Sequence, residues 1–143
     1  MNRNEIKIEF GSDPRNESFA RVVVASFMTR TNPTLEEVAD VKTAVSEAVT
    51  NSIIHGYGQG EGTIEIQAYI EERKLYIEIT DYGCGIEDVE KAMEPMFTTG
   101  KDGRSGMGFS FMEAFMDELT VESEPGKGTT VKMAKKIGAG CAV

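Results

Sequence analysis

The sequence predicts an α/β two-layer sandwich, a mixed and mainly antiparallel sheet with helices on one face. Segments that alternate apolar and polar residues, as strands do, follow the order strand, helix, helix and then strands interleaved with helices. Two pairs of these alternating segments are joined by tight turns, which predicts antiparallel hairpins and excludes a simple doubly wound parallel sheet.

The first half of the chain supplies one strand and two helices. Asp13 and Pro14 form a start signal for the first helix, and a capping box of Thr34 and Glu37 starts the second. The predicted strand covers residues 4–10, and the predicted helices cover about 14–30 and about 34–56.

The second half supplies two hairpins and two shorter helices. The first hairpin turns around Glu72–Lys74, and the second turns at a Pro-Gly-Lys-Gly sequence. Between the hairpins we expect a short helix, a loop that contains glycine and lysine, and a helix with a glycine-rich start. The predicted ranges are 62–81 and 119–137 for the hairpins, 87–93 and 106–118 for the helices and 95–105 for the loop.

Composition limits the kind of protein. The 143 residues, 40% apolar and 27% charged, are typical of one globular domain over 1–143, with a disordered tail at 137–143. A net charge of −9 argues against direct binding to nucleic acid, and no apolar run approaches the roughly 20 residues of a membrane span. Two cysteines and one histidine are too few for a structural zinc site. We expect a cytoplasmic protein that contacts neither nucleic acid nor membrane.

One motif that can bind a flat ligand is TDYGCGI, residues 80–86. Asp81 ends a predicted strand and can accept a hydrogen bond from an exocyclic amine. Gly83 and Gly85 let the backbone approach such a ligand closely. The alternative is a strand that ends in an ordinary glycine turn.

A second motif, SGMGFSFM, can bind phosphate. Gly106 and Gly108 open a helix whose N-terminal N–H groups attract anions, and Lys101 and Arg104 lie just upstream. The spacing is not that of a P-loop or of a Rossmann fingerprint, and a glycine pair before a helix is common.

Three polar residues share one side of the helix over 34–56. Glu47, Asn51 and His55 are spaced four apart, which indicates either a solvated face or one wall of a cleft. In a cleft, Asn51 is suited to a hydrated magnesium ion, Glu47 to accepting a proton, and His55 to the free carbonyls at the helix end. Thr129 or Thr130 of the last hairpin can reach the floor of such a cleft.

Taken in order, these motifs resemble those of the GHKL superfamily, which unites gyrase-type, Hsp90-type and MutL-type ATPases with histidine kinases. The matching patterns are E-x-x-x-N, D-x-G-x-G, T-T-G-K, G-x-G at a helix start and G-T on a late strand, over about residues 34–133. The resemblance implies the Bergerat ATP-binding fold, with ATP and Mg²⁺ as cofactors.

The resemblance also implies a role for each matching residue. Glu47 corresponds to the catalytic base, Asn51 to the magnesium ligand, and Asp81 with Thr130 to the residues that hold adenine. A short lid covers 98–104, and Phe109 stands where many relatives carry leucine. The implied nucleotide-binding residues are Asn51, Asp81, Gly83, Gly85, Ile86, Thr98, Thr99, Gly100, Lys101, Arg104, Ser105, Gly106, Met107, Gly108, Phe109 and Thr130.

Within the superfamily, the chain is similar to the one-domain anti-sigma branch of spore-forming bacteria. The only histidine lies inside the nucleotide motif, and we expect no second domain that supplies a catalytic lysine or arginine. The matching stretches are NESFARV, VSEAVTNSIIHGY, FTTGKDGRSGMGF and FMDELTVESEPGKGTTV. The resemblance implies a homodimer in the forespore cytoplasm that binds a sporulation sigma factor (sigma F) and, as an ATP-dependent serine protein kinase, phosphorylates an anti-anti-sigma protein. The alternative is a nucleotide-gated binding module without physiological kinase activity.

Glu17 and Arg21 lie on the helix over 14–30, which is apolar on two sides and carries no nucleotide motif. They are either an i,i+4 ion pair on a solvated face or part of a partner-binding surface in which Arg21 is an anchor. The resemblance favours the second, because NESFAR is among the matching stretches.

Overall fold

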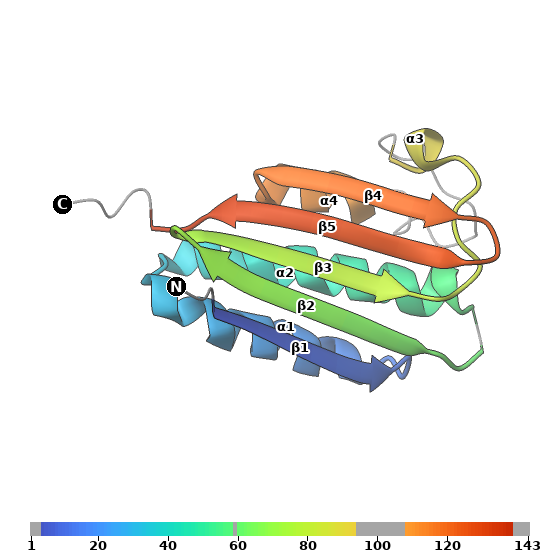
Figure 1. Cartoon of the computed structure of the whole chain (residues 1–143), viewed down its shortest axis with the longest axis horizontal. Coiled ribbons are helices and arrows are strands. Elements are labelled where there is room, and N and C mark those ends of the chain that lie inside the picture. Colours follow the sequence, from blue (N-terminus) through green and yellow to red (C-terminus); the bar gives the residue numbers. More distant parts are fainter. Residues whose placement is uncertain (1–3, 59, 94–107, 139–143) are drawn as a thin grey trace.

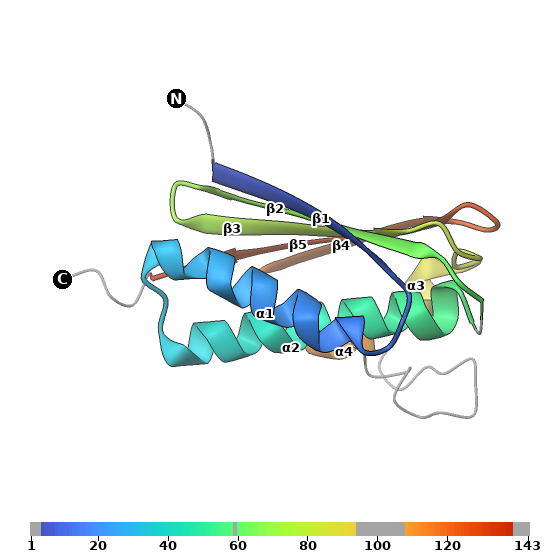
Figure 2. The same cartoon turned by 90° about the horizontal axis from the view of Figure 1, so that it is seen from below.

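A five-stranded sheet forms one layer of the protein and helices form the other (Figures 1 and 2). The computed structural model describes residues 4–58, 60–93 and 108–138. The strands lie in the order β1-β2-β3-β5-β4, and each neighbouring pair is antiparallel, so the prediction of a mainly antiparallel sheet is confirmed. The strands are β1 (Asn4–Gly11), β2 (Thr63–Glu71), β3 (Lys74–Asp81), β4 (Glu118–Glu124) and β5 (Gly128–Lys136).

Helices α1, α2 and α4 cover one face of the sheet, as Figure 2 shows. The predicted capping box is confirmed at the start of α2, where the Glu37 N–H donates to Thr34 Oγ1 at 3.0 Å and the Thr34 N–H donates to Glu37 Oε1 at 2.9 Å. In the described parts of the chain, every helix is too short or too polar to cross a membrane. The helices are α1 (Asn16–Met28), α2 (Leu35–Asn51), α3 (Val89–Ala92) and α4 (Gly108–Phe115), and the short turns η1 (Thr29–Thr31, 3-10) and η2 (Ser52–Gly56, π) follow α1 and α2.

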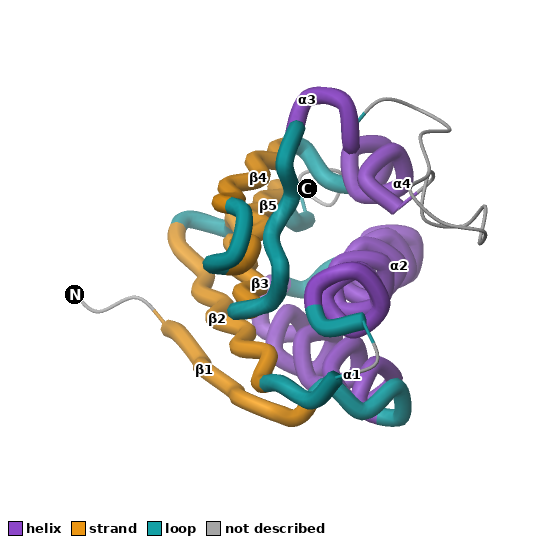
Figure 3. The backbone as a smooth tube through the Cα atoms, turned by 90° about the vertical axis from the view of Figure 1, so that its right-hand side faces the viewer, coloured by secondary structure: helices purple, strands orange, loops and turns teal. Residues whose placement is uncertain are grey.

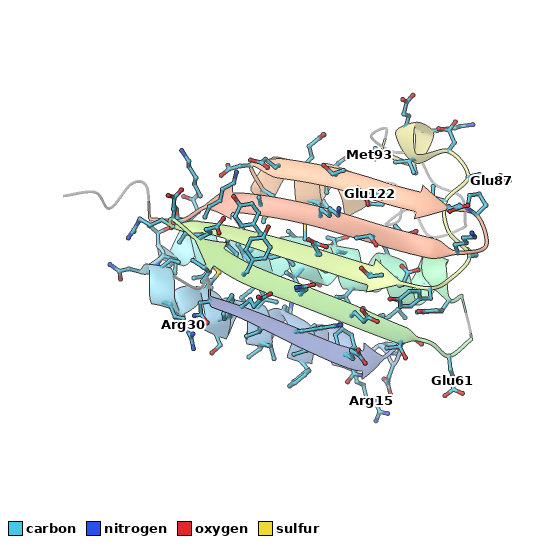
Figure 4. The ribbon with its side chains drawn as sticks, viewed as in Figure 1. Arg15, Arg30, Glu61, Glu87, Met93 and Glu122 are labelled. Carbon is cyan, nitrogen blue, oxygen red and sulfur yellow. The ribbon has the colours of Figure 1, made fainter. Side chains whose placement is uncertain are left out.

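Apolar side chains fill the space between the two layers. Because successive strand residues point to opposite faces, every second residue of β2 and β3 enters this core. Completely buried residues include Ile64, Ile66 and Ala68 of β2, Leu75, Ile77 and Ile79 of β3, and Val24, Met28, Val41, Val45, Val49 and Met112 of the helices. The opposite face of the sheet is largely polar and faces the viewer in Figure 4, where Glu122 marks β4.

Two residues after the end of β5 contact the rest of the fold. Ile137 is only 1% exposed, and the Gly138 N–H donates to the Glu37 carboxylate at 3.1 and 3.2 Å. Two residues of the predicted tail thus pack against the fold, since Ile137 fills an apolar site and Gly138 is hydrogen-bonded to the start of α2. Residues 139–143 lie outside the described part.

The turn between β2 and β3 offers a test of backbone strain. Glu72 and Arg73 have φ values of 51° and 65°, as a two-residue hairpin turn requires, although neither is a residue type that favours this region. Asn tolerates the left-handed conformation better, so Glu72→Asn should raise the free energy of unfolding by about 0.5–1 kcal/mol. Urea denaturation measures the change. Glu71→Asn, one residue earlier in β2, should give no gain, and an equal gain there would contradict the explanation.

Candidate functional site

A pocket of about 520 Å³ opens at the end of the molecule where α2 and β3 both terminate, a size typical of small-ligand sites. Figure 3 views the molecule from this end, and Glu87 marks the pocket's rim in Figure 4. Its lining comes from three parts of the fold: Ala48, Asn51, Ser52, His55 and Gly56 of α2 and η2, Asp81, Thr129 and Val131 of the sheet, and Cys84 to Asp88, Lys91, Ala92 and Phe109 of the remaining segments.

The polar stripe of α2 contributes to this pocket only in part. Asn51 and His55 line it, which supports the cleft over a solvated face. The Asn51 Nδ2 atom is buried and has no hydrogen-bond partner among the described residues. Glu47, one turn before Asn51, is half-buried and lies outside the pocket lining that the described residues form.

Asp81 lies at a core-facing position of β3, where an apolar residue would be expected. It continues the inward row of β3 after Leu75, Ile77 and Ile79, and it is only 3% exposed. A buried carboxylate is costly unless hydrogen bonds compensate, and the Gly83 N–H donates to Asp81 Oδ1 at 2.9 Å. This placement at the pocket floor indicates a binding role.

The surroundings of Asp81 define what it can bind. Burial raises the pKa of Asp81 above its ordinary value of 3.8, while hydrogen bonds from the Gly83 backbone, the Ser52 hydroxyl and the Thr129 backbone act in the opposite direction. All three of these neighbours are donors. A carboxylate offers about four acceptor positions, so Asp81 retains capacity for one more donor, such as an amine of a ligand.

The two glycines after Asp81, Gly83 and Gly85, have different surroundings. A Cβ atom on Gly83 would lie 2.0 Å from the Gly56 carbonyl oxygen, and the neighbouring Cys84 N–H donates to that oxygen at 2.7 Å. Gly83 therefore allows close approach to the backbone of η2, and it does not itself belong to the described lining of the pocket. Gly85 itself lines the pocket.

Thr130, predicted to help hold adenine, does not belong to the described lining of the pocket. Thr130 lies on the outer face of the sheet, where its hydroxyl is 3.1 Å from that of Thr80. Thr129 is the threonine that lines the pocket, opposite Asp81 in the strand register. The reason is the period of two along β5, which turns Thr129 and Val131 inward and Thr130 outward.

The remaining predicted nucleotide residues fall into two groups. Ile86 and Phe109 line the pocket, and Gly108 is the first residue of α4. Ile86 is held in place by its backbone N–H, which donates to Ser123 Oγ at 2.7 Å. Thr98, Thr99, Gly100, Lys101, Arg104, Ser105, Gly106 and Met107 lie outside the described residues.

The Glu17 and Arg21 pair lies on α1, which contributes no residue to the described lining of the pocket. Arg21 Nε is 3.5 Å from Glu17 Oε2, an ion-pair distance, but this buried oxygen accepts no hydrogen bond among the described residues. Two neighbouring apolar residues of the same helix, Phe19 and Val22, are each 56% exposed.

Sequence reasoning did not single out several residues of the pocket. Ser52 and Cys84 adjoin predicted site residues in the sequence, so the sequence indicates that they lie near the site. It does not indicate that they line the pocket. Cys84 carries a free thiol, whose Sγ is 3.0 Å from the His55 carbonyl oxygen. Lys91, at the rim, follows no motif.

Known structures share this fold. The histidine kinase domain of the blue-light activated histidine kinase from Erythrobacter litoralis EL346 matches with a TM-score of 0.57 at 18% sequence identity. The match covers 85% of this chain and 61% of that one. At this identity the similarity shows the fold alone.

Sequence comparisons are more specific. A family model for the histidine kinase-like ATPase domain matches residues 10–135. The anti-sigma F factor of Thermoanaerobacter sp. (strain X514) is 58% identical over 137 residues, which are 95% of this chain and 96% of that protein. The anti-sigma F factor of Caldanaerobacter subterraneus subsp. tengcongensis is 59% identical over 136 residues, which are 94% of this chain and 95% of that protein. The chain belongs to the histidine kinase-like ATPase domain family and, within it, to the anti-sigma F factors.

Proposed function

We propose that this chain inhibits a sporulation sigma factor by binding it, and that it is an ATP-dependent kinase of a serine on an anti-anti-sigma protein. The observation that carries the proposal is the buried carboxylate of Asp81 at the floor of the pocket, in a chain 58% identical to an anti-sigma F factor. The chain acts as one domain over 1–143, as a homodimer in the forespore cytoplasm.

The base of ATP binds at the Asp81 end of the pocket. The exocyclic amine of adenine donates to Asp81, the one neighbour that the carboxylate still lacks. Ile86, Phe109 and Val131 supply apolar contacts to the ring. Thr129, and not Thr130, is the threonine that lies beside Asp81 in the pocket and helps to hold the base.

The phosphates bind at the Asn51 end of the pocket, near the start of α4. One terminal atom of the buried Asn51 amide has no hydrogen-bond partner among the described residues. A 180° flip of the amide would put its oxygen at this position, and an amide oxygen is a suitable magnesium ligand. Asn51 would hold the ion beside the phosphates, and a bound ion would supply charge neutralisation for the transferred group. Glu47 is the base that accepts the serine proton.

The alternative is a nucleotide-gated binding module without kinase activity. The position of Glu47 outside the described pocket lining favours it. We retain the kinase because a chain that only binds needs no base, and Glu47 lies one turn before Asn51.

The Asp81→Asn variant tests the adenine assignment. Three donors surround Asp81, so an amide NH₂ group in its place would face at least one of them unpaired. Such a loss costs about 1–3 kcal/mol, so ATP affinity should fall roughly ten- to a hundredfold. GTP, which lacks the adenine amine, should lose less. Calorimetric titration with both nucleotides measures this, and equal losses would make Asp81 purely structural.

The Arg21→Glu variant tests the partner surface on α1. Reversing the charge beside the exposed Phe19 and Val22 should weaken binding of the sigma factor or the anti-anti-sigma protein more than about tenfold, or 1.4 kcal/mol. ATP binding should not change, because α1 supplies none of the described pocket residues. Pull-down and calorimetry with each partner measure the effect. Wild-type binding of both partners would reduce Arg21 to half of a surface ion pair.

A further inference from the structure

The π turn η2 directs two groups of the chain toward the loop that follows Asp81. The Tyr57 N–H donates to the Ser52 carbonyl at 3.0 Å, a spacing of five residues. The Gly56 carbonyl is then free to accept the Cys84 N–H, at 2.7 Å. Tyr57 itself comes directly after the turn and is half-buried.

The Tyr57 hydroxyl links this turn to two strands. It donates to the Thr63 carbonyl of β2 at 2.5 Å and accepts the Tyr82 N–H at 2.7 Å. The Tyr82 residue is 57% exposed, so its N–H could otherwise bond to water. The structure instead gives it a fixed side-chain acceptor.

Three successive backbone N–H groups after Asp81 thus have fixed acceptors. Those of Tyr82, Gly83 and Cys84 donate to the Tyr57 hydroxyl, to Asp81 Oδ1 and to the Gly56 carbonyl. Two of these three acceptors belong to the consecutive residues Gly56 and Tyr57. Gly56 and Tyr57 therefore fix the conformation of the Tyr82–Cys84 loop, which in turn positions the Asp81 carboxylate.

From this network we propose that Tyr57 is a positioning residue for recognition of the base. Tyr57 is not itself among the described residues that line the pocket, and it acts by holding the Tyr82–Cys84 backbone so that Asp81 presents its free acceptor position to the ligand. The inference rests on the proposed binding of adenine at Asp81.

Gly62 offers an independent way to disturb Tyr57. A Cβ atom at Gly62 would lie 2.2 Å from Tyr57 Cε1, so Gly62→Ala must displace the ring. Gly62 does not belong to the described pocket lining. Gly11 makes a matched control, since it lies opposite Thr63 on the neighbouring strand and a Cβ atom there would meet nothing within 4 Å.

Tyr57→Phe removes the hydroxyl and keeps the ring. Loss of these hydrogen bonds should weaken ATP binding and ADP binding by the same factor, about fivefold to tenfold, because both nucleotides share the base. The preference for ATP over GTP should fall by a similar factor, whereas the turnover rate at saturating ATP should stay at the wild-type value. Tyr76→Phe, on the outer face of β3, is the control for a tyrosine hydroxyl lost elsewhere.

Amide hydrogen exchange gives a readout that needs no nucleotide. The Tyr82 amide should be protected in the wild-type protein and should exchange at least about tenfold faster in Tyr57→Phe. Gly62→Ala should reproduce both the faster exchange and the loss of ATP affinity, and Gly11→Ala should reproduce neither.

Two results would overturn the inference. One is an unprotected Tyr82 amide in the wild-type protein. The other is a Tyr57→Phe variant whose ATP affinity and ATP-to-GTP preference change no more than those of Tyr76→Phe. Failure of the proposed function looks different, because then the wild-type protein binds no ATP or Asp81→Asn binds it normally.

Discussion

The Glu47→Gln variant is expected to bind ATP normally and to phosphorylate serine about 10²–10⁴-fold more slowly than the wild-type protein. Glutamine keeps the size of the side chain but cannot accept the proton that the serine hydroxyl loses. Because Glu47 lies outside the described lining of the pocket, ATP affinity should stay within about twofold of the wild-type value. Single-turnover transfer with the anti-anti-sigma protein measures the rate, and calorimetry measures ATP binding.

Glu36→Gln is the matched control for this variant. Glu36 lies in the first turn of the same helix, at the end remote from Asn51, and the same chemical change there should leave transfer unaffected. Binding of the sigma factor should survive in both variants, because in the proposed function it depends on the bound nucleotide and not on phosphate transfer. Transfer at the wild-type rate by Glu47→Gln would assign the base to another residue.

The Asn51→Ala variant is expected to lose transfer by more than about 10²-fold and to bind ATP more weakly when Mg²⁺ is present. A magnesium ion contributes several kcal/mol of charge stabilisation to phosphoryl transfer, and the variant lacks the amide that we assign to it. Transfer assays and ATP titrations at fixed Mg²⁺ concentration measure the two effects.

Chelation of the metal separates this role from a purely steric one. With EDTA present, Asn51→Ala and the wild-type protein should bind ATP with the same affinity, because neither then holds the ion. An equal loss of affinity with and without Mg²⁺ would show that Asn51 contacts the nucleotide directly and would contradict the metal assignment.

Most of the helices and strands are predictable from the sequence, because each is marked by a pattern within its own residues. Alternation located the strands, and the Thr34–Glu37 capping box located the start of α2. The π turn after Asn51 was not predictable, since it depends on Ser52 to Tyr57 closing a wider turn against the loop after Asp81. The packing of residues 137 and 138 is not predictable for a similar reason, because the contact from Gly138 to Glu37 joins residues far apart in sequence.

The sequence motifs located several residues that line the pocket, but they did not reveal on which face of the sheet a side chain lies. Asp81 and Asn51 both line the pocket, whereas Thr130 was chosen although the alternation of β5 already favours Thr129. The role of Tyr57 could not be read from sequence, because its partners Thr63 and Tyr82 meet it only in the folded sheet.

Phosphate transfer from ATP to a partner protein tests the central claim most directly. The wild-type chain, with γ-labelled ATP and Mg²⁺, should label the anti-anti-sigma protein on serine, and mass spectrometry should identify phosphoserine as the product. The label should be absent when Asn51→Ala replaces the wild-type chain. A wild-type chain that binds ATP and the sigma factor but leaves the anti-anti-sigma protein unlabelled would contradict the kinase assignment and establish the nucleotide-gated binding module in its place.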